Sequence, residues 1–195
     1  LIKISESHLC PDFLIRFGIR QLLRSRIASL ISQGQGTEND NQKKMDFIEA
    51  MNSSPIALVP ELANEQHYEV PSKFYDFCLG EHKKYSSCYW NDKANNLNKA
   101  EEEALKLTST HARLEDGQSI LELGCGWGSL TLWMAKKFPK SQITAVSNSK
   151  SQKTYILNEA KKRKLKNIKV ITQDMNKFST RDSFDRVVSV EMIEH

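Results

Sequence analysis

The stretch SILELGCGWG, residues 119–128, determines how most of the remaining sequence is interpreted. Apolar residues that favour β-structure run directly into alternating glycines, and the helix-like segment SLTLWMAKKF follows. This order predicts a buried strand, a turn without side chains and a helix N-terminus. In such a turn a ligand can approach the backbone and meet free N–H groups at the positive end of the helix dipole. Glycine also serves packing in a tight turn, but the whole combination favours cofactor binding.

The spacing of the glycines distinguishes two kinds of cofactor. A dinucleotide fingerprint reads G-x-G-x-x-G and has an acidic residue about twenty positions later. Here the third glycine comes one residue early, and residues 144–148 contain no Asp or Glu. With Glu122 ahead of the first glycine, the pattern E-x-G-x-G-x-G resembles motif I of the class I S-adenosylmethionine (SAM) methyltransferases. That resemblance implies SAM as the cofactor and a Rossmann-like α/β fold.

Composition and charge limit the classes of protein that remain. Charged residues make up 27% of the 195-residue chain, and the net charge of +4 is mild. No apolar run approaches the roughly eighteen residues that span a bilayer. The cysteines form no C-x-x-C pair, which favours free thiols in a reducing compartment, so we expect a cytoplasmic protein without a metal site. The basic run at 161–164 ends a predicted helix, where cations face water, so no nucleic-acid partner is expected.

Both ends of the sequence look cut. The chain starts on Leu1 and stops at His195, immediately after a predicted strand. The residues after 118 hold fewer strands than a complete class I methyltransferase sheet. We therefore expect a fragment, and one that is inactive or poorly soluble by itself, because an open parallel edge strand invites aggregation. Nothing in the sequence indicates the oligomeric state.

Residues 1–44 are predicted to form a helical lead-in followed by a linker. Apolar residues recur at helical spacing over 9–31 with arginines between them, which is typical of a basic amphipathic helix. Such a helix either packs with its arginines exposed or lies on an anionic membrane surface. We favour packing for this helix, with peripheral membrane contact as the alternative. The polar segment GQGTENDNQKK, residues 34–44, is predicted as linker, with a short helix around 43–51.

Residues 45–115 are predicted to form a helical cap that contributes to the cofactor site. Pro71 and Ser72 start a short helix that Gly80 closes. Asn98 with Glu101 is predicted to form a capping box for a helix that reaches about residue 113.

Residues 116–195 are predicted to form the N-terminal half of a Rossmann-like domain. Strands alternate with helices, which predicts a doubly wound parallel sheet with its ligand at the carboxyl ends of the strands. The predicted strands are 119–123, 142–147, 168–172 and 184–190, and the predicted helices are 129–138 and 150–164.

Each part of SAM needs a different partner at that edge. The amides of the glycine turn suit the amino-acid end, and Ser147 and Asn148 after the second strand suit the ribose hydroxyls. Asp174, after the third strand, can accept from the adenine amino group. Aromatic faces can attract the sulfonium, although packing is the safer interpretation of any single ring. The candidate rings are Tyr85, Tyr89, Trp90 and Trp127.

Residues 66–195 resemble the cyclopropane-fatty-acyl-phospholipid synthase family, and most of all its plant-type branch, the coclaurine N-methyltransferases. The glycine stretch and the segment EMIEH carry the most specific part of the resemblance. The matching segments follow the family order: QHYEVP (66–71), KYSSCYW (84–90), DGQSILELGCGWGSLTL (116–132), AVSNSKSQ (145–152), DMNKF (174–178) and FDRVVSVEMIEH (184–195).

The resemblance implies how SAM is held. Tyr85 and Ser86 contact the cofactor, and the positions of Ser147, Asn148 and Gln152 hold its ribose and methionine parts. An alternative role for Gln152 is a capping box with Ser149. The remaining implied cofactor residues belong to motif I and the third strand: Glu122, Gly124, Gly126, Gly128 and Asp174.

The resemblance also implies a reaction centre made by Glu191, Glu194 and His195. These positions help to hold a bicarbonate base in cyclopropane-forming members, and they orient and deprotonate the acceptor in amine methylators. Ser87 stands where cyclopropane-forming members usually have cysteine, which favours methylation of a small hydrophobic amine. Cyclopropanation of an unsaturated lipid acyl chain and a non-catalytic SAM-binding module are the alternatives.

Overall fold

The computed structural model describes residues 10–33, 37–58 and 70–192. The chain divides into two compact units, residues 1–55 and 56–195. The boundary predicted between residues 44 and 45 falls inside a continuous helix. The division predicted at residue 115, between cap and Rossmann-like half, stays a prediction.

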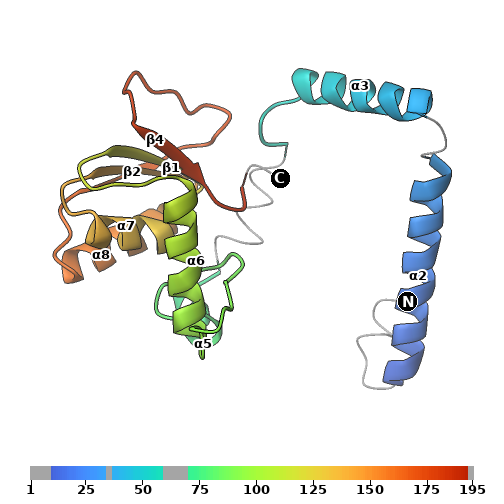
Figure 1. Ribbon diagram of the computed structural model, residues 1–195, viewed down its shortest axis with the longest axis horizontal. Coiled ribbons are helices and arrows are strands. Elements are labelled where there is room, and N and C mark those ends of the chain that lie inside the picture. Colours follow the sequence, from blue (N-terminus) through green and yellow to red (C-terminus); the bar gives the residue numbers. More distant parts are fainter. Residues whose placement is uncertain (1–9, 34–36, 59–69, 193–195) are drawn as a thin grey trace. The chain divides into compact units, whose positions relative to one another are not determined.

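The first unit contains helices α2 (Asp12–Gln33) and α3 (Thr37–Ser53) (Figure 1). Helix α2 confirms the helix predicted over 9–31. The prediction of a linker over 34–44 is wrong from Thr37 onward, where α3 begins. The polar composition of this segment was interpreted as a sign of a loop. An exposed helix needs no apolar stripe, and good helix formers with contacts such as Gln42 Nε2 to Asp46 Oδ1 (2.7 Å) stabilise it locally.

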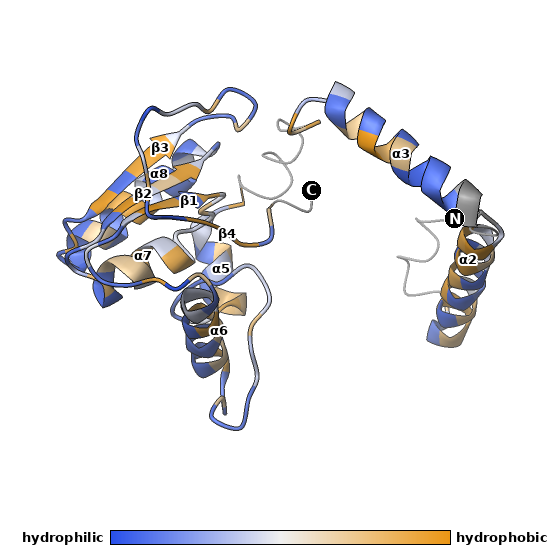
Figure 2. Ribbon diagram, turned by 45° about the horizontal axis from the view of Figure 1, so that its top comes forward, coloured by the Kyte–Doolittle hydropathy of each residue, from blue (hydrophilic) through white to orange (hydrophobic). Residues whose placement is uncertain are grey.

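Helix α2 is less amphipathic than its sequence predicted. Hydrophobic and hydrophilic residues are intermixed along it (Figure 2). Residues four apart share one side of a helix, so Arg16, Arg20 and Arg24 form a row beside Phe13 and Phe17. All five of these residues are exposed.

The second unit is built on a parallel sheet of strand order β3-β2-β1-β4. The strands are β1 (Ser119–Leu123), β2 (Gln142–Ser147), β3 (Ile168–Thr172) and β4 (Arg186–Ser189). The first three have the predicted bounds, and β4 is shorter at both ends. Their residues pair in parallel register, so their carboxyl ends meet at one edge of the sheet.

Helices α7 (Ser129–Lys137) and α8 (Lys150–Lys162) pack against one face of this sheet (Figure 1). Strands alternate the direction of their side chains, so Ile120, Ile143 and Val188 point toward α7 and are buried there. Val187, next to Val188, is 59% exposed. The apolar character of β2 and β3 is visible in Figure 2.

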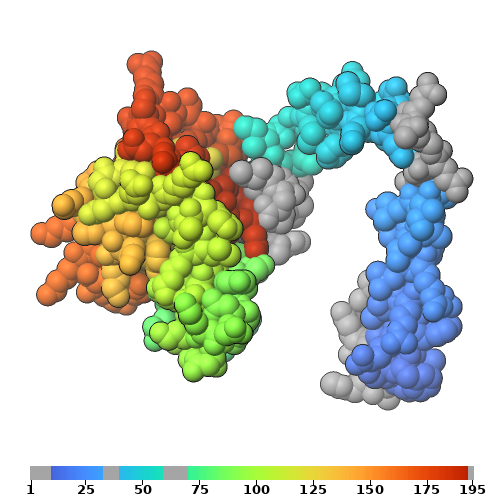
Figure 3. Space-filling view, in the orientation of Figure 1, coloured from blue at the N-terminus to red at the C-terminus, as the bar shows by residue number. Residues whose placement is uncertain are grey.

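Helix α6 (Leu97–His111) lies beside the sheet and joins it through Leu105. The face shown in Figure 3 has α6 next to β4, and Arg186 Nε donates to the Ala112 carbonyl at 3.1 Å. The cleft between them is lined by residues of both elements, including Thr108, His111 and Val187.

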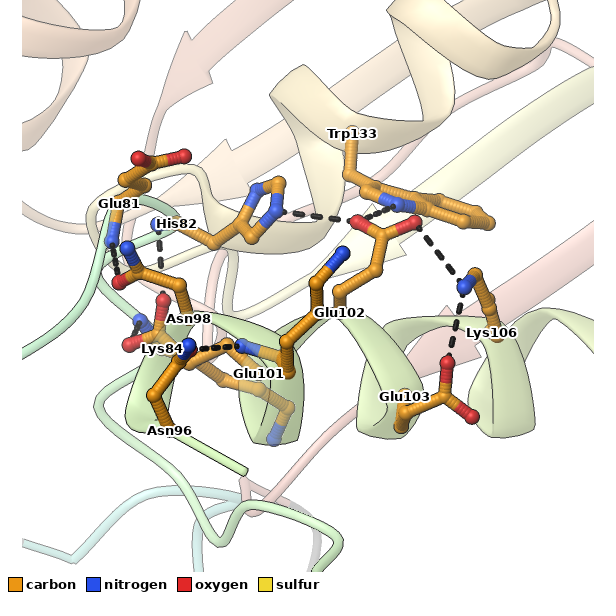
Figure 4. A network of polar contacts seen from close by, with 11 residues as sticks. Glu81, His82, Lys84, Asn96, Asn98, Glu101, Glu102, Glu103, Lys106 and Trp133 are labelled. Carbon is orange, nitrogen blue, oxygen red and sulfur yellow. Dashed lines mark hydrogen bonds and ion pairs between the residues drawn. The ribbon is translucent and has the colours of Figure 1, made fainter. Parts of the chain in front are cut away.

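The predicted capping box of α6 is wrong. Asn96 caps the helix and accepts a hydrogen bond from the Lys99 N–H at 3.0 Å. Asn98 accepts instead from the Glu81 N–H (Figure 4), and Glu101 accepts from the Gly80 N–H. These side chains bind the loop that follows α5 (Ser72–Cys78), so they cannot also close the first turn of α6.

Candidate cofactor and acceptor site

The turn after β1 is anchored to β2 by its first two amides. The N–H groups of Gly124 and Cys125 both donate to the Val146 carbonyl at 3.0 Å. The N–H groups of Gly126 and Trp127 have no hydrogen-bond partner within the part of the chain that the structure describes. Helix α7 begins at the next residues, and its N-cap is a glycine without a capping side chain. Two unused amides therefore lie beside an uncapped helix N-terminus, where an anionic group is stabilised.

The three glycines of the motif are required for different reasons. A Cβ atom at Gly124 would collide with Met192, and one at Gly128 would lie 2.6 Å from Ile156. A Cβ atom at Gly126 would meet nothing within 4 Å. Packing thus explains Gly124 and Gly128, whereas at Gly126 the space outside the backbone is open and has room for a ligand.

Among the polar residues after β2, some side chains are hydrogen-bonded to one another and one is not. Ser147 is buried, donates to Gln152 Oε1 at 2.6 Å and accepts from the Ser149 N–H at 3.1 Å. Ser149 caps α8 by accepting from the Gln152 N–H, which is one half of the predicted capping box. Asn148 is half-buried, and its side chain has no hydrogen-bond partner among the described residues. Asn148 is therefore the residue of this group that could meet a ligand without losing an internal bond.

The loop after β3 carries the predicted adenine acceptor. Asp174 is half-buried, and its Oδ1 accepts from the Asn176 N–H at 2.9 Å. Asn176 exchanges hydrogen bonds with the backbone of Ala57 in both directions, at 2.8 and 2.9 Å. Among the described residues, the hydroxyls of Thr172 at the end of β3 and Ser129 at the start of α7 are buried without a partner. Buried polar atoms normally have one, so their position at the ligand edge fits a polar cofactor.

Glu122 of motif I lies under α7 rather than in the open space. It is buried, and its carboxyl group accepts from the Thr131 hydroxyl at 2.5 Å. Burial raises the pKa of Glu122 to about 8, against the smaller lowering effect of the Thr131 bond. Glu122 therefore carries a proton at neutral pH, and its contact with a cofactor stays a prediction.

Aromatic rings form a wall near the turn. Tyr75 is buried and lies between Tyr85 (5.1 Å between ring centroids) and Trp127 (5.5 Å). Trp127 also contacts Tyr155 at 5.4 Å. Two of the predicted rings, Tyr85 and Trp127, thus belong to one cluster, and the sequence interpretation missed Tyr75 and Tyr155. The only signal for Tyr75 was its place in the aromatic segment 66–90.

The other two predicted rings lie outside this cluster. Tyr89 and Trp90 are 46% and 58% exposed. They have no ring contact among the described residues.

The predicted reaction centre meets the predicted cofactor loop at one carboxylate. Ser87 donates both its backbone N–H and its hydroxyl to Glu191 Oε1, each at 2.8 Å. Ser86 accepts from Lys84 Nζ at 2.5 Å. Glu194 and His195 lie outside the described residues, so their predicted roles stay predictions.

Metal and membrane features are absent from the described part of the chain. Residues 10–33, 37–58 and 70–192 contain no group of three or more His, Cys, Asp or Glu side chains placed to hold a metal ion. Within the same ranges, no helix combines the length and apolar character needed to cross a bilayer.

The parallel sheet, with a glycine turn and an open ligand edge after β1, defines the fold of the class I SAM methyltransferases. The crystal structure of coclaurine N-methyltransferase bound to N-methylheliamine and S-adenosylhomocysteine has the same fold. It matches with a TM-score of 0.81 and 34% sequence identity, over 90% of this chain and 51% of that one.

Residues 60–195 match the profile of the mycolic acid cyclopropane synthetase family, and the chain belongs to that family. The (S)-coclaurine N-methyltransferase of Thalictrum flavum subsp. glaucum is 35% identical over 197 residues, covering 100% of this chain and 54% of the relative. The cyclopropane-fatty-acyl-phospholipid synthase of Escherichia coli (strain K12) is 31% identical over 134 residues, covering 69% and 33% respectively. The chain spans about half the length of the N-methyltransferases it matches.

Proposed function

We propose that this protein is a SAM-dependent methyltransferase that acts on the nitrogen of a small hydrophobic amine. The observation that carries the proposal is the open space at Gly126, bordered by two unused amides and the uncapped start of α7. The relatives named N-methyltransferase support the choice of an amine over other acceptors.

The proposed cofactor contacts follow the polar groups around that space. The amides of Gly126 and Trp127 would receive the amino-acid carboxylate, Asn148 the ribose and Asp174 the adenine amino group. The ring of Tyr85, which is 53% exposed, would face the sulfonium. Ser86, Ser147 and Gln152 are also proposed for the cofactor site, although Ser147 and Gln152 hold one another.

The proposed reaction needs alignment and proton removal from this chain. SAM supplies an activated methyl carbon when it is bound. Glu191 and Glu194 would orient the protonated amine, and His195 would accept its proton, since a neighbouring carboxylate makes an imidazole a competent base near neutral pH. Alignment of the freed nitrogen can contribute several kcal/mol to lowering the barrier, on the order of 7–11 in the most favourable cases.

Cyclopropanation of an unsaturated acyl chain is the second candidate, because the family profile and the Escherichia coli relative carry that name. Ser87 favours the amine. Its hydroxyl donates to Glu191 at 2.8 Å, which is a hydrogen bond that a thiol would make only weakly.

The proposal is tested with the full-length protein in two assays. Equilibrium dialysis should show binding of labelled SAM and none of NAD. Incubation with SAM and benzylisoquinoline-type amines should yield an N-methyl product, whereas unsaturated phospholipids should yield no cyclopropane. Cyclopropane alone would select the second candidate, and SAM binding without any product would indicate a non-catalytic module.

We further propose a cytoplasmic location, which the four free cysteines support. Peripheral membrane contact through residues 9–31 is an alternative to the packing of α2. The exposed row of Arg16, Arg20 and Arg24 beside Phe13 and Phe17 supports it. Co-sedimentation of the protein with anionic but not neutral phospholipid vesicles would favour membrane contact, and no co-sedimentation would favour packing.

A further inference from the structure

We infer that Lys84 is a positioning residue that holds the turn at Ser86 and Ser87, and through Ser87 the carboxylate of Glu191. The inference rests on the proposed function, since it concerns how Glu191 is presented to an acceptor. Three bonded steps carry it, from α6 to Lys84, from Lys84 to the turn, and from the turn to Glu191.

The backbone end of Lys84 is anchored to α6. Glu101 is fully buried and accepts from the N–H groups of Gly80 and His82 at 2.8 Å and of Lys84 at 3.2 Å. Figure 4 shows Glu101 with His82 and Lys84, two of the residues whose N–H groups it accepts from. A buried carboxylate with three backbone donors is satisfied and cannot easily move. The loop from Gly80 to Lys84 therefore has a fixed place relative to α6.

The ammonium end of Lys84 binds the next residues of the chain. Lys84 is only 5% exposed, and its Nζ donates to Ser86 Oγ at 2.5 Å and to the Ser87 carbonyl at 2.6 Å. Lysine is rarely buried to this degree unless its charge has partners. Burial lowers the pKa of Lys84, and the nearby Cys88, Glu191 and Glu101 oppose that shift. The two hydrogen bonds of Lys84 Nζ therefore reach both residues of the turn.

The turn then fixes Glu191. Ser87 is bound at its carbonyl by Lys84 and donates from its N–H and hydroxyl to Glu191 Oε1. Two donors on one carboxylate oxygen define its position, whereas one donor would leave it free to rotate. Loss of Lys84 would release the turn and let these donors move. Displacements of about 1 Å at a reacting centre can lower turnover by about 100-fold.

Lys83 provides a matched control. It is also buried, at 8% exposed, and lies next to Lys84 in the chain. Its Nζ pairs with Asp76, donates to the Ser72 carbonyl at 3.0 Å and lies over the Tyr155 ring, with no bond to the Ser86–Ser87 turn. Lys83→Met and Lys84→Met therefore each remove one buried ammonium, and only Lys84→Met affects the path to Glu191.

The experiment compares Lys84→Met, Ser87→Ala, the double variant and Lys83→Met in the full-length protein. We measure kcat and KM for the amine, SAM affinity by calorimetry, and thermal stability. Lys84→Met should lower kcat about 10-fold or more. SAM affinity should fall by a smaller factor, because Ser86 on the same turn is a proposed cofactor contact. Lys83→Met should keep kcat within about threefold even where its melting temperature falls equally. The Lys84→Met/Ser87→Ala double variant should lose less kcat than the product of the two single losses, because both substitutions act on the bonds from Ser87 to Glu191.

Independent losses in the double variant, or an equal loss of kcat in Lys83→Met, would overturn the inference. If Lys84→Met does not fold, Lys84→Gln, which keeps a donor, replaces it. If wild-type protein methylates no amine, the proposed function fails separately. The coupling between Lys84 and Glu191 is then measured from the free energies of urea unfolding of Lys84→Met, Glu191→Gln and their double variant. Non-additive losses of unfolding free energy support the coupling between Lys84 and Glu191, and additive losses overturn the inference.

Discussion

Ser87 and Glu191 are 104 positions apart in the chain, and a single carboxylate oxygen of Glu191 accepts both the backbone N–H and the hydroxyl of Ser87. This contact joins the loop after α5 to the segment that follows β4. One segment was predicted to hold the cofactor and the other to hold the acceptor. The contact therefore places Glu191 of the candidate reaction centre next to the candidate cofactor loop.

Gly126→Val should abolish SAM binding, with a loss of affinity of about 100-fold or more. The new side chain would fill the open space at the turn and screen the unused amides. Gly117→Val is the matched control, because Gly126 (φ +52°) and Gly117 (φ +95°) both have a positive φ and open space, but Gly117 lies before β1. Both variants should melt at a lower temperature. Equal SAM affinity in both would show that the space at Gly126 holds no cofactor.

Glu191→Ala and His195→Ala should each lower kcat by about 100-fold or more while SAM affinity stays near that of the wild type. The reason is that both groups are proposed to act on the acceptor and not on the cofactor. Turnover and calorimetric binding are measured on the full-length protein, with Glu115→Ala, an exposed position, as control. Normal turnover in both variants would place the base elsewhere.

Glu122 should make folding stability depend on pH. Its pKa rises from an ordinary value of 4.5 to about 8 in the folded protein, so the folded state keeps a proton that the unfolded chain releases. Stability from this group is present below about pH 4.5 and falls as the pH rises to about 8. Glu122→Gln mimics the protonated form.

Urea unfolding between pH 5 and 9 should therefore show wild type losing stability relative to Glu122→Gln as the pH rises. A constant difference between the two proteins across this range would mean that Glu122 does not change its protonation on unfolding.

Glu101→Gln should destabilise the second unit by about 1–3 kcal/mol. The substitution replaces an acceptor oxygen with a donor, opposite backbone N–H groups that Glu101 now satisfies. The measurement is the free energy of urea unfolding, compared with Glu81→Gln, whose side chain is exposed. Indistinguishable midpoints for the two variants would contradict a structural role for the buried carboxylate.

The sequence by itself determined the parallel sheet and its glycine turn. Each of the first three strands is a short apolar run bounded by polar or glycine residues, so local composition sufficed to place it with the observed bounds. The same local reasoning found only residues 43–51 of α3 and missed its first part from Thr37, because an exposed helix has no apolar periodicity for a pattern to detect.

Only the tertiary structure decided what the polar side chains do. Asn98 and Glu101 accept hydrogen bonds from backbone amides up to 21 positions away. The side chain that caps α6 is therefore that of Asn96. The difference between Gly126 and its neighbours depends on Met192 and Ile156, which lie in other segments. Hydrogen bonds and close contacts depend on distance in space, and a pattern of residues along the chain carries that distance only within one element.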